Sequence, residues 1–474
     1  MELATSPISI YHDLFDRDPS SADDLFISEI KNNIKISNLP LLNFNCHYEE
    51  IPDGHLVRVI GFVQDSLEHE YFMHRFDKIS PLGEKISSTA KYQDFHKIGD
   101  YELDESSVKL SERFSFYIVP IPGMNFWIKS RISNNCNFIN SSSTICGKRK
   151  LDKISENSAS KLRKNFPLIE EEASNDHGVL ARVYKGASDI LISDLVEMVG
   201  ILEHPRLAQL KDKDSVEFDQ IYPTIQVIDY KKFSFSSILK SPEGFQAKSC
   251  REFLLNHFKK LTGDEVLSKY LLINMVDKPI VELEKAFATD FSSLNVFNTN
   301  VDQTKTLIKS LKYLFKSIFP QIVYVELNIK NLNEGSCLWP SRDSDSMRLK
   351  TGRLQLNTGC QVLIDETDLQ EGKLETLGVY NLQAIHKVCT THQIPINFQV
   401  YIQNFPCPLN CLIISNSQSL IKDINIIKWK VDKVETDIGE IDEQTMEALR
   451  DYIVQAKRSD LDYRLGDEFQ EVIK

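Results

Sequence analysis

The sequence lacks the motifs by which several large enzyme classes are identified. It contains no G-x-x-x-x-G-K-[ST] phosphate-binding loop, no G-x-G-x-x-G dinucleotide fingerprint and no G-x-S-x-G nucleophile elbow. Each motif supplies a physical element, a glycine turn held against phosphate or an exposed serine, on which the corresponding chemistry depends. These absences argue against a P-loop nucleotide hydrolase, a Rossmann-type dehydrogenase and an α/β-hydrolase.

Long apolar runs and a cysteine framework are also missing. The longest apolar stretches, such as Tyr270–Val276, are far shorter than the roughly 20 residues needed to span a bilayer. The N-terminal segment carries acids where a signal peptide carries bases, and the nine cysteines show no repeated spacing. We therefore expect no membrane association, and reduced thiols in a nuclear or cytosolic protein.

Positive charge is scarce. The 55 Lys and Arg residues are outnumbered by 68 Asp and Glu residues, which gives a formal net charge of −13. An acidic chain repels phosphate backbones, so a protein partner fits better than a general nucleic-acid ligand. Single-strand binding stays an alternative, because aromatic residues of the β-rich segments could stack on bases; these are Phe62, Tyr71, Phe72, Phe114, Phe116 and Tyr117.

Residues 1–132 form the first predicted domain. Helical spacing of apolar residues runs from Tyr11 to Ile36. Short strands separated by turn residues follow at Leu56–Asp65, Glu70–Phe76, Phe114–Gly123 and Asn125–Ile132. This pattern predicts an N-terminal helix followed by a small β-barrel of the oligonucleotide-binding (OB) type.

Residues 133–176 have the composition of a linker, rich in serine, asparagine and lysine. Two basic clusters lie in this segment: Lys148 and Arg149, then, after a ten-residue spacer, the stretch SKLRK (160–164) with Lys161, Arg163 and Lys164. Two separated clusters on an extended segment can occupy two acidic sites of an import receptor at once. In a chain that is otherwise acidic, the pattern favours a bipartite nuclear import signal over an ordinary solvated linker.

Residues 177–235 hold a second β-rich, OB-like unit. Val179–Gly186, Asp189–Leu202 and Thr224–Phe233 read as strands, with Gly200 permitting tight coiling. This unit forms either a separate barrel or the remainder of the first one across the linker.

Residues 247–430 alternate between strand and helix patterns, which predicts a largely parallel sheet. The tail, 431–474, reads as an amphipathic helix with a solvated acidic face. The predicted fold class is therefore α+β multidomain. It combines an N-terminal OB-like β-barrel region with a C-terminal AAA-like α/β domain that has no phosphate-binding loop.

One strand of the C-terminal segment resembles a magnesium-binding strand. The stretch CQVLIDE, Cys360–Glu366, ends in Asp365 and Glu366. In a working hydrolase such an Asp holds Mg²⁺ and the following Glu positions water. The turn where a phosphate cradle belongs, SSLNVFNTNVDQTK, contains no glycine and no Gly-Lys-Ser/Thr. We interpret Asp365 and Glu366 as a Walker-B-like relic and expect neither catalytic residues nor a cofactor.

A metal site built from His386, Cys389, His392, Cys407 and Cys411 is disfavoured. The spacing of these residues does not match the tight pairs of structural zinc sites, and Cys411 opens an apolar strand. Free cysteines are common core residues, so we predict no metal.

Several stretches together resemble one eukaryotic family. They are LVRVIGFVQDSLEHEYFM, FYIVPIPG with FWIK, LARVYKGASDILISDLVEMVGIL, GRLQLNTGCQVLIDETDLQEGKLETLGVYNLQAI and FPCPLNCLIIS. In this order they are similar to the minichromosome maintenance complex-binding protein family, over about Leu56 to Leu420, with Gly352–Ile385 the most specific part. Family members often continue beyond GDEFQEVIK, so this chain is either a compact member or a truncated sequence.

The resemblance implies a nuclear, non-enzymatic, chaperone-like partner of the minichromosome maintenance (MCM) helicase subunits. It also implies roles in handling new subunits, in releasing the helicase from chromatin late in replication, and in sister-chromatid cohesion. The alternatives are a single-stranded nucleic-acid-binding replication factor that uses the barrel faces and an unusual ATPase.

Overall fold

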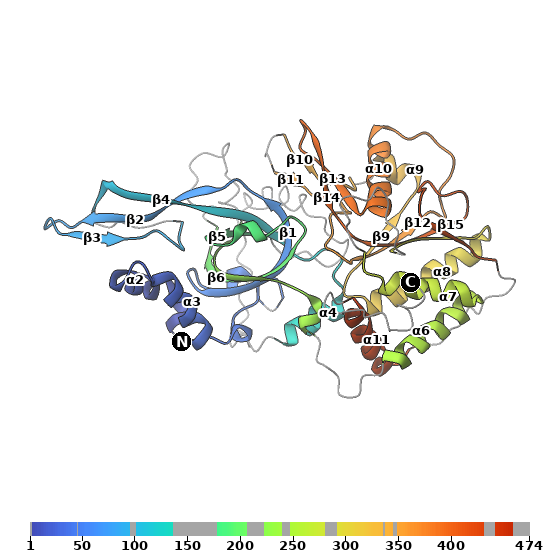
Figure 1. The fold of residues 1–474 in the computed structure, drawn as a ribbon, viewed down its shortest axis with the longest axis horizontal. Helices are drawn as coiled ribbons and strands as arrows, with labels where there is room; N and C mark the ends of the chain where they lie inside the picture. The colour runs from blue at the N-terminus through green and yellow to red at the C-terminus, as the bar shows by residue number, and fades with distance from the viewer. Residues whose placement is uncertain are drawn as a thin grey trace, which may run out of the picture.

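The fold is mixed α/β and consists of two halves, each with its own sheets (Figure 1). The computed structural model describes residues 2–44, 46–94, 101–135, 178–205, 222–238, 247–279, 292–334, 337–344, 348–430 and 441–457. Within these ranges the N-terminal half carries a seven-stranded sheet, and the C-terminal half carries a five-stranded and a four-stranded sheet. No helix in the described ranges is long and apolar enough to cross a membrane.

The strands of the N-terminal half pair in a closed ring. They are β1 Leu56–Ser66, β2 Glu70–Ile79, β3 Lys85–Ser88, β4 Glu102–Val119, β5 Val179–Val183, β6 Leu195–Glu203 and β7 Thr224–Lys232. Their order is β1-β6-β7-β5-β4-β2-β3, and β1 also pairs with β4. The ring therefore runs through β1, β6, β7, β5 and β4, while β2, β3 and the far part of β4 extend from it as a ribbon (Figure 1). An OB-like topology stays a prediction.

The two β-rich segments of the sequence share this one sheet. β5 pairs antiparallel with β4, with Phe114 opposite Val183, and parallel with β7, with Leu180 opposite Thr224. β6 pairs antiparallel with β1. Strands that follow residue 177 thus complete a ring begun by strands that precede residue 120, which answers the question that the sequence left open.

Two glycines allow the ring to close tightly. A Cβ atom on Gly61 of β1 would lie 2.5 Å from Ile118 Cγ2, on the neighbouring strand β4. A Cβ atom on Gly200 of β6 would lie 2.4 Å from the carbonyl oxygen of Gln226, where the β6–β7 register shifts. Only glycine lets the backbones approach this closely, so substitution of either residue would force the strands apart.

Four helices pack against the N-terminal sheet. They are α1 Glu2–Thr5, α2 Pro7–Arg17, α3 Ala22–Asn33 and α4 Phe126–Asn134. The helical pattern predicted for Tyr11–Ile36 is confirmed, but it forms two helices, α2 and α3, with a break at residues 18–21. The predicted strand at Asn125–Ile132 is wrong, because this segment is α4. Ile128 and Ile132, four residues apart, are both buried on one side of α4.

The C-terminal half is built on five parallel strands. They are β8 Ser293–Phe297, β9 Ile322–Glu326, β12 Gln361–Asp365, β15 Asn410–Ser415 and β16 Asn425–Lys428. Their order is β16-β8-β15-β12-β9, and every pairing is parallel, as the strand–helix alternation predicted. The four-stranded sheet beside them contains β10 Ser341–Arg342, β11 Leu349–Lys350, β13 Gln393–Asn397 and β14 Ile402–Pro406.

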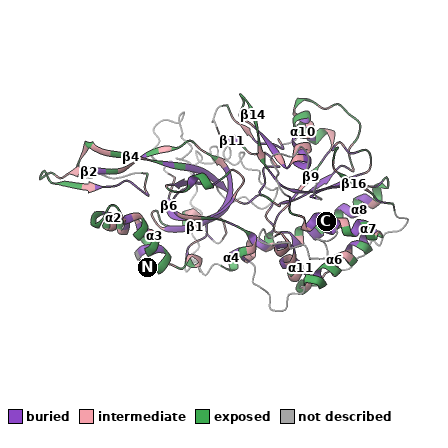
Figure 2. Cartoon of the chain, viewed as in Figure 1, coloured by how far each residue is buried: buried purple, intermediate pink, exposed green. Residues whose placement is uncertain are grey.

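Helices pack on both faces of the five-stranded sheet. They are α6 Ala247–Thr262, α7 Glu265–Val276, α8 Val301–Ile318, α9 Ile329–Glu334, α10 Thr376–Thr391 and α11 Glu443–Ala456. One buried cluster joins α6, α7, α8 and α11 to the sheet, and a second joins α9 and α10 to the other face. Figure 2 shows the buried residues concentrated along the strands and on the inward sides of these helices.

Helix α4 connects the two halves through polar contacts. Asn125 Nδ2 and Trp127 Nε1 donate hydrogen bonds to the carbonyl oxygen of Phe319, at 2.6 and 3.0 Å. Arg131 donates to Asp451 of α11 at 2.7 Å and to Glu447 at 3.0 Å. The end of α8 and one side of α11 are therefore both held by α4.

We predict that Arg131→Met lowers the stability of the whole chain. The side chains of Arg131 and Asp451 are 19% and 13% exposed, so the substitution leaves a largely buried carboxylate without its partner. The free energy of unfolding should fall by about 2 kcal/mol. Urea denaturation followed by circular dichroism measures this loss.

Lys269→Met is the matched control. Lys269 pairs with Glu265 one helical turn away, but both side chains are more than half exposed. Such a pair contributes only about 0.3–0.5 kcal/mol, so the control should unfold close to the wild type. Equal losses for the two variants would contradict the role given to the Arg131–Asp451 pair.

Candidate functional site at the carboxyl edge of the five-stranded sheet

In open α/β sheets, ligands bind outside the carboxyl ends of the strands, and β12 ends there in Asp365. The carboxylate of Asp365 accepts hydrogen bonds from the backbone amide and the hydroxyl of Thr367, at 2.9 and 2.7 Å. Its second oxygen accepts the hydroxyl of Tyr324 from β9, and burial, with this carboxylate adding to it, raises the pKa of Tyr324. Asp365 is therefore satisfied by side chains and backbone of its own chain.

Glu366 has the opposite environment. The residue is 1% exposed, and neither carboxylate oxygen has a partner with hydrogen-bond geometry among the described residues. Burial raises the pKa of Glu366 to about 7, although Ser419 and the Leu420 amide face the carboxyl and act to lower it. A neutral carboxyl group avoids the free-energy penalty of an unpaired buried charge. Glu366 is thus held close to the point of protonation at neutral pH.

The turn after β8 does not form a phosphate cradle. It consists of the three residues Asn298–Asn300, none of which is glycine. The Asn300 side chain caps α8 by accepting the amides of Asp302 and Gln303, at 3.1 and 3.2 Å. The backbone amides that would bind phosphate at a helix N-terminus are therefore already used by the capping residue.

Asn416 connects two other elements at this edge. Asn416, directly after β15, accepts a hydrogen bond from the Thr304 hydroxyl of α8 at 2.6 Å. Its amide donates to the carbonyl of Thr367 at 3.3 Å, and the ion pair between Lys305 and Asp368 spans 3.0 Å nearby. The start of α8 and the turns after β12 and β15 are consequently linked to one another through Asn416.

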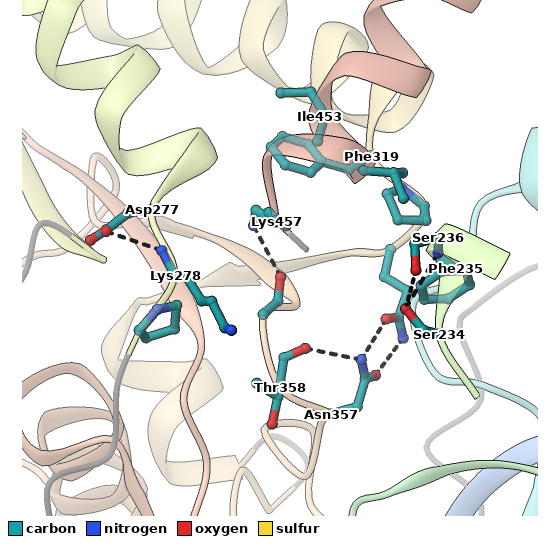
Figure 3. Close-up of a pocket in the computed structure, with 15 residues that line it drawn as sticks. Ser234, Phe235, Ser236, Asp277, Lys278, Phe319, Asn357, Thr358, Ile453 and Lys457 are labelled. Carbon is teal, nitrogen blue, oxygen red and sulfur yellow. Dashed lines mark hydrogen bonds between the residues drawn. The ribbon is translucent and has the colours of Figure 1, made fainter. Parts of the chain in front are cut away.

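A cavity of about 440 Å³ lies elsewhere, between the two halves (Figure 3). Gln321 and Gly359, which line the cavity, precede β9 and β12, so it lies at the amino ends of these strands. Lys457 lines it too and donates to the Gly359 carbonyl at 3.0 Å and to Asn410 Oδ1 at 2.9 Å. Burial lowers the pKa of Lys457 to about 8. None of the carboxyl-edge residues lines this cavity.

The five residues considered for a metal site do not form one set of ligands, although the thiols of Cys389 and Cys411 are in contact. Cys389, Cys407 and Cys411 are buried in the core, where burial raises the pKa of Cys407 to about 12. His386 faces Asp423 at 3.6 Å, whereas His392 ends α10 in the left-handed region and contacts Ser292 through Nε2 at 3.2 Å. Within the described ranges, no three His, Cys, Asp or Glu residues are placed to hold a metal ion.

The import-signal residues cannot be placed. Lys148, Arg149, Lys161, Arg163 and Lys164 lie outside the described residues. The prediction of an import signal therefore stays a prediction.

We predict that Glu366→Gln changes how stability depends on pH. The pKa of this carboxyl is about 7 in the folded protein, above the ordinary value of 4.5. Folding therefore takes up a proton between these values, and wild-type stability should fall as pH rises from about 5 to about 7. The glutamine variant lacks this loss and should exceed the wild type at pH 8 by up to about 3 kcal/mol.

Urea denaturation of both proteins at pH 5 and pH 8 measures this difference. At pH 5 the two should be nearly equal, because glutamine has the shape and neutrality of a protonated glutamate. Glu334→Gln, at an exposed position of α9, is the control and should follow the wild type at both pH values. Parallel pH profiles for Glu366→Gln and the wild type would contradict the assignment.

Comparison with known proteins places the chain in a family. A family model described as mini-chromosome maintenance replisome factor matches residues 26–161 and 133–474. The mini-chromosome maintenance complex-binding protein of Gallus gallus is 23% identical, over 88% of this chain and 78% of that protein. The protein of the same name from Arabidopsis thaliana is 24% identical, over 95% and 83%. The chain belongs to the mini-chromosome maintenance replisome factor family.

Proposed function

We propose that the chain is a non-enzymatic nuclear binding protein of the MCM replicative helicase. In this role it regulates the assembly of helicase subunits and their release from chromatin during DNA replication, and it supports sister-chromatid cohesion. The observation that carries the proposal is the family match over most of the chain, together with relatives that are named as binding proteins of the mini-chromosome maintenance complex.

The carboxyl edge supports binding rather than hydrolysis. A three-residue turn without glycine leads into α8, and the Asn300 cap uses the amides that a phosphate would need. Asp365 is satisfied by Tyr324 and Thr367. Electrostatic stabilisation of a transferred phosphoryl group needs a preorganised cradle and a metal. The cradle is not formed by these residues.

We further propose that the chain imitates a helicase subunit in layout. The closed ring of β1, β6, β7, β5 and β4 would correspond to an OB-like front half, and the five parallel strands to a degenerate AAA-like rear half. A chain of this layout could take the place of a subunit without hydrolysing ATP. Binding to one arrangement of the ring would shift its equilibrium toward assembly or disassembly.

The alternative is single-stranded nucleic-acid binding through aromatic residues. Four of the six candidate rings are buried in the core: Phe62, Phe72, Phe116 and Tyr117. Tyr71, on β2, and Phe114, on β4 opposite β5, are 60% and 40% exposed. Two exposed rings in a chain of net charge −13 offer little of the basic groove that such proteins use.

Affinity purification after nuclease digestion tests the proposed function. We expect helicase subunits to remain bound when DNA and RNA have been degraded, since the contact is between proteins. Mass spectrometry identifies the retained subunits. A purification without helicase subunits would contradict the proposal.

The salt dependence of binding to single-stranded oligonucleotides distinguishes nucleic-acid binding from the proposed function. A phosphate-binding surface loses affinity steeply between about 50 and 200 mM salt. We expect no saturable binding at either concentration.

A further inference from the structure

The four-stranded sheet ends in an open edge strand, β14. The order of this sheet is β11-β10-β13-β14, so β14 has no neighbour on its outer side in the described part of the chain. It pairs antiparallel with β13, with Asn397 opposite Ile402. Four of its five residues are exposed, and Phe405 is half-buried. Figure 2 shows β14 at the surface of the C-terminal half.

Two residues of β14 direct backbone hydrogen-bonding groups outward. Bonded and non-bonded pairs alternate along an antiparallel ladder. At one end of the ladder the Phe398 amide donates to the Tyr401 carbonyl at 2.9 Å. At the other end the Cys407 amide donates to the His392 carbonyl at 2.7 Å. The backbone groups of Gln403 and Phe405 therefore form hydrogen bonds with β13. The amides and carbonyls of Ile402 and Asn404 point away from β13.

An apolar tip adjoins this open edge. Val400, Tyr401 and Ile402 are 93%, 55% and 52% exposed. Tyr401 is stacked on Phe398, with ring centroids 5.1 Å apart, so its ring is held in place. Edge strands that avoid other chains carry lysine, proline or a bulge, but β14 has none of these before Pro406. β14 has only five residues. The exposed apolar side chains beside it could add contact area to a strand that pairs with this edge.

The lysine beside the edge favours a strand that carries a carboxylate over a second copy of this chain. Lys387 of α10 donates to Asn404 Oδ1 at 3.0 Å and has no ion-pair partner among the described residues. A two-fold pairing of β14 with its own copy would bring two Lys387 side chains to the same edge, where like charges repel each other.

We infer that β14 accepts an extended strand from a helicase subunit by β-strand addition. The added strand carries apolar residues that meet Val400, Tyr401 and Ile402, and a carboxylate that meets Lys387. Backbone bonds to Ile402 and Asn404 supply affinity, and the side chains supply specificity. The inference rests on the proposed function and names the surface through which that function acts.

Hydrogen–deuterium exchange of the full chain with recombinant MCM subunits tests the inference. Complex formation should slow exchange at the amides of Ile402 and Asn404. The amides of Gln403 and Phe405 should change little, because they already bond to β13. A complex that forms without protection at Ile402 and Asn404 would overturn the inference and leave the proposed function standing. Failure to form any complex would count against both.

Two variants measure the contribution of the edge to affinity. Ile402→Pro removes one outward amide, and Val400→Asp places a charge at a 93% exposed site without entering the core. Each should weaken binding of the recombinant subunits about tenfold, the loss of roughly one hydrogen bond or one apolar contact. Ile402→Val is the control and should bind like the wild type. Unchanged affinity for Val400→Asp, with an unchanged melting temperature, would contradict the inference.

Analytical ultracentrifugation of the chain alone, at increasing concentrations, tests whether β14 pairs with a second copy of the chain instead of a helicase subunit. We expect a constant sedimentation coefficient. Dimerisation that protects the Ile402 and Asn404 amides would overturn the inference, because a second copy would then be the occupant of the edge.

Discussion

Burial of β12 on both faces is the constraint on which the C-terminal half depends. Leu363 packs into the cluster formed with α6, α7, α8 and α11, while Val362 and Ile364 pack into the cluster formed with α9 and α10. Alternate side chains of one strand thus enter both layers, as a central parallel strand requires. The carboxyl end of β12 is thereby fixed, with Asp365 beside Tyr324 and Glu366 enclosed in the interior.

Three turns converge at the carboxyl edge of the five-stranded sheet, where open α/β sheets bind their ligands. Their polar groups are nonetheless engaged: Asn300 caps α8, Asn416 links Thr304 to Thr367, and Lys305 pairs with Asp368. A nucleotide would have to break these contacts without the backbone amides that compensate for such a loss in a phosphate loop.

Much of this half could be predicted from local patterns. The break between α6 and α7 follows from Gly263, which has a φ of +65°, and from the Asp264 cap, both of which are readable in sequence. The position of Asp365 at a strand end was also predictable from an apolar run closed by acids. The cap at Asn300 could have been found from an asparagine preceding an amphipathic helix.

Long-range contacts were not accessible in this way. Thr304 and Asn416 are 112 residues apart, and no local pattern connects a threonine on one helix with an asparagine after a distant strand. The closing of the ring by β5, between β4 and β7, likewise depends on pairings across a long intervening segment. The mistaken strand at α4 has a different cause: in a short segment, apolar residues four positions apart, such as Ile128 and Ile132, lie on one face of a strand as well as on one face of a helix.

Titration of the purified chain with Mg-ATP in a calorimeter tests the central claim most directly. The claim is that the carboxyl edge of the five-stranded sheet is closed by its own side chains and holds no nucleotide. It predicts no saturable heat of binding and no phosphate release. Saturable, magnesium-dependent binding that disappears in Asp365→Asn would contradict it.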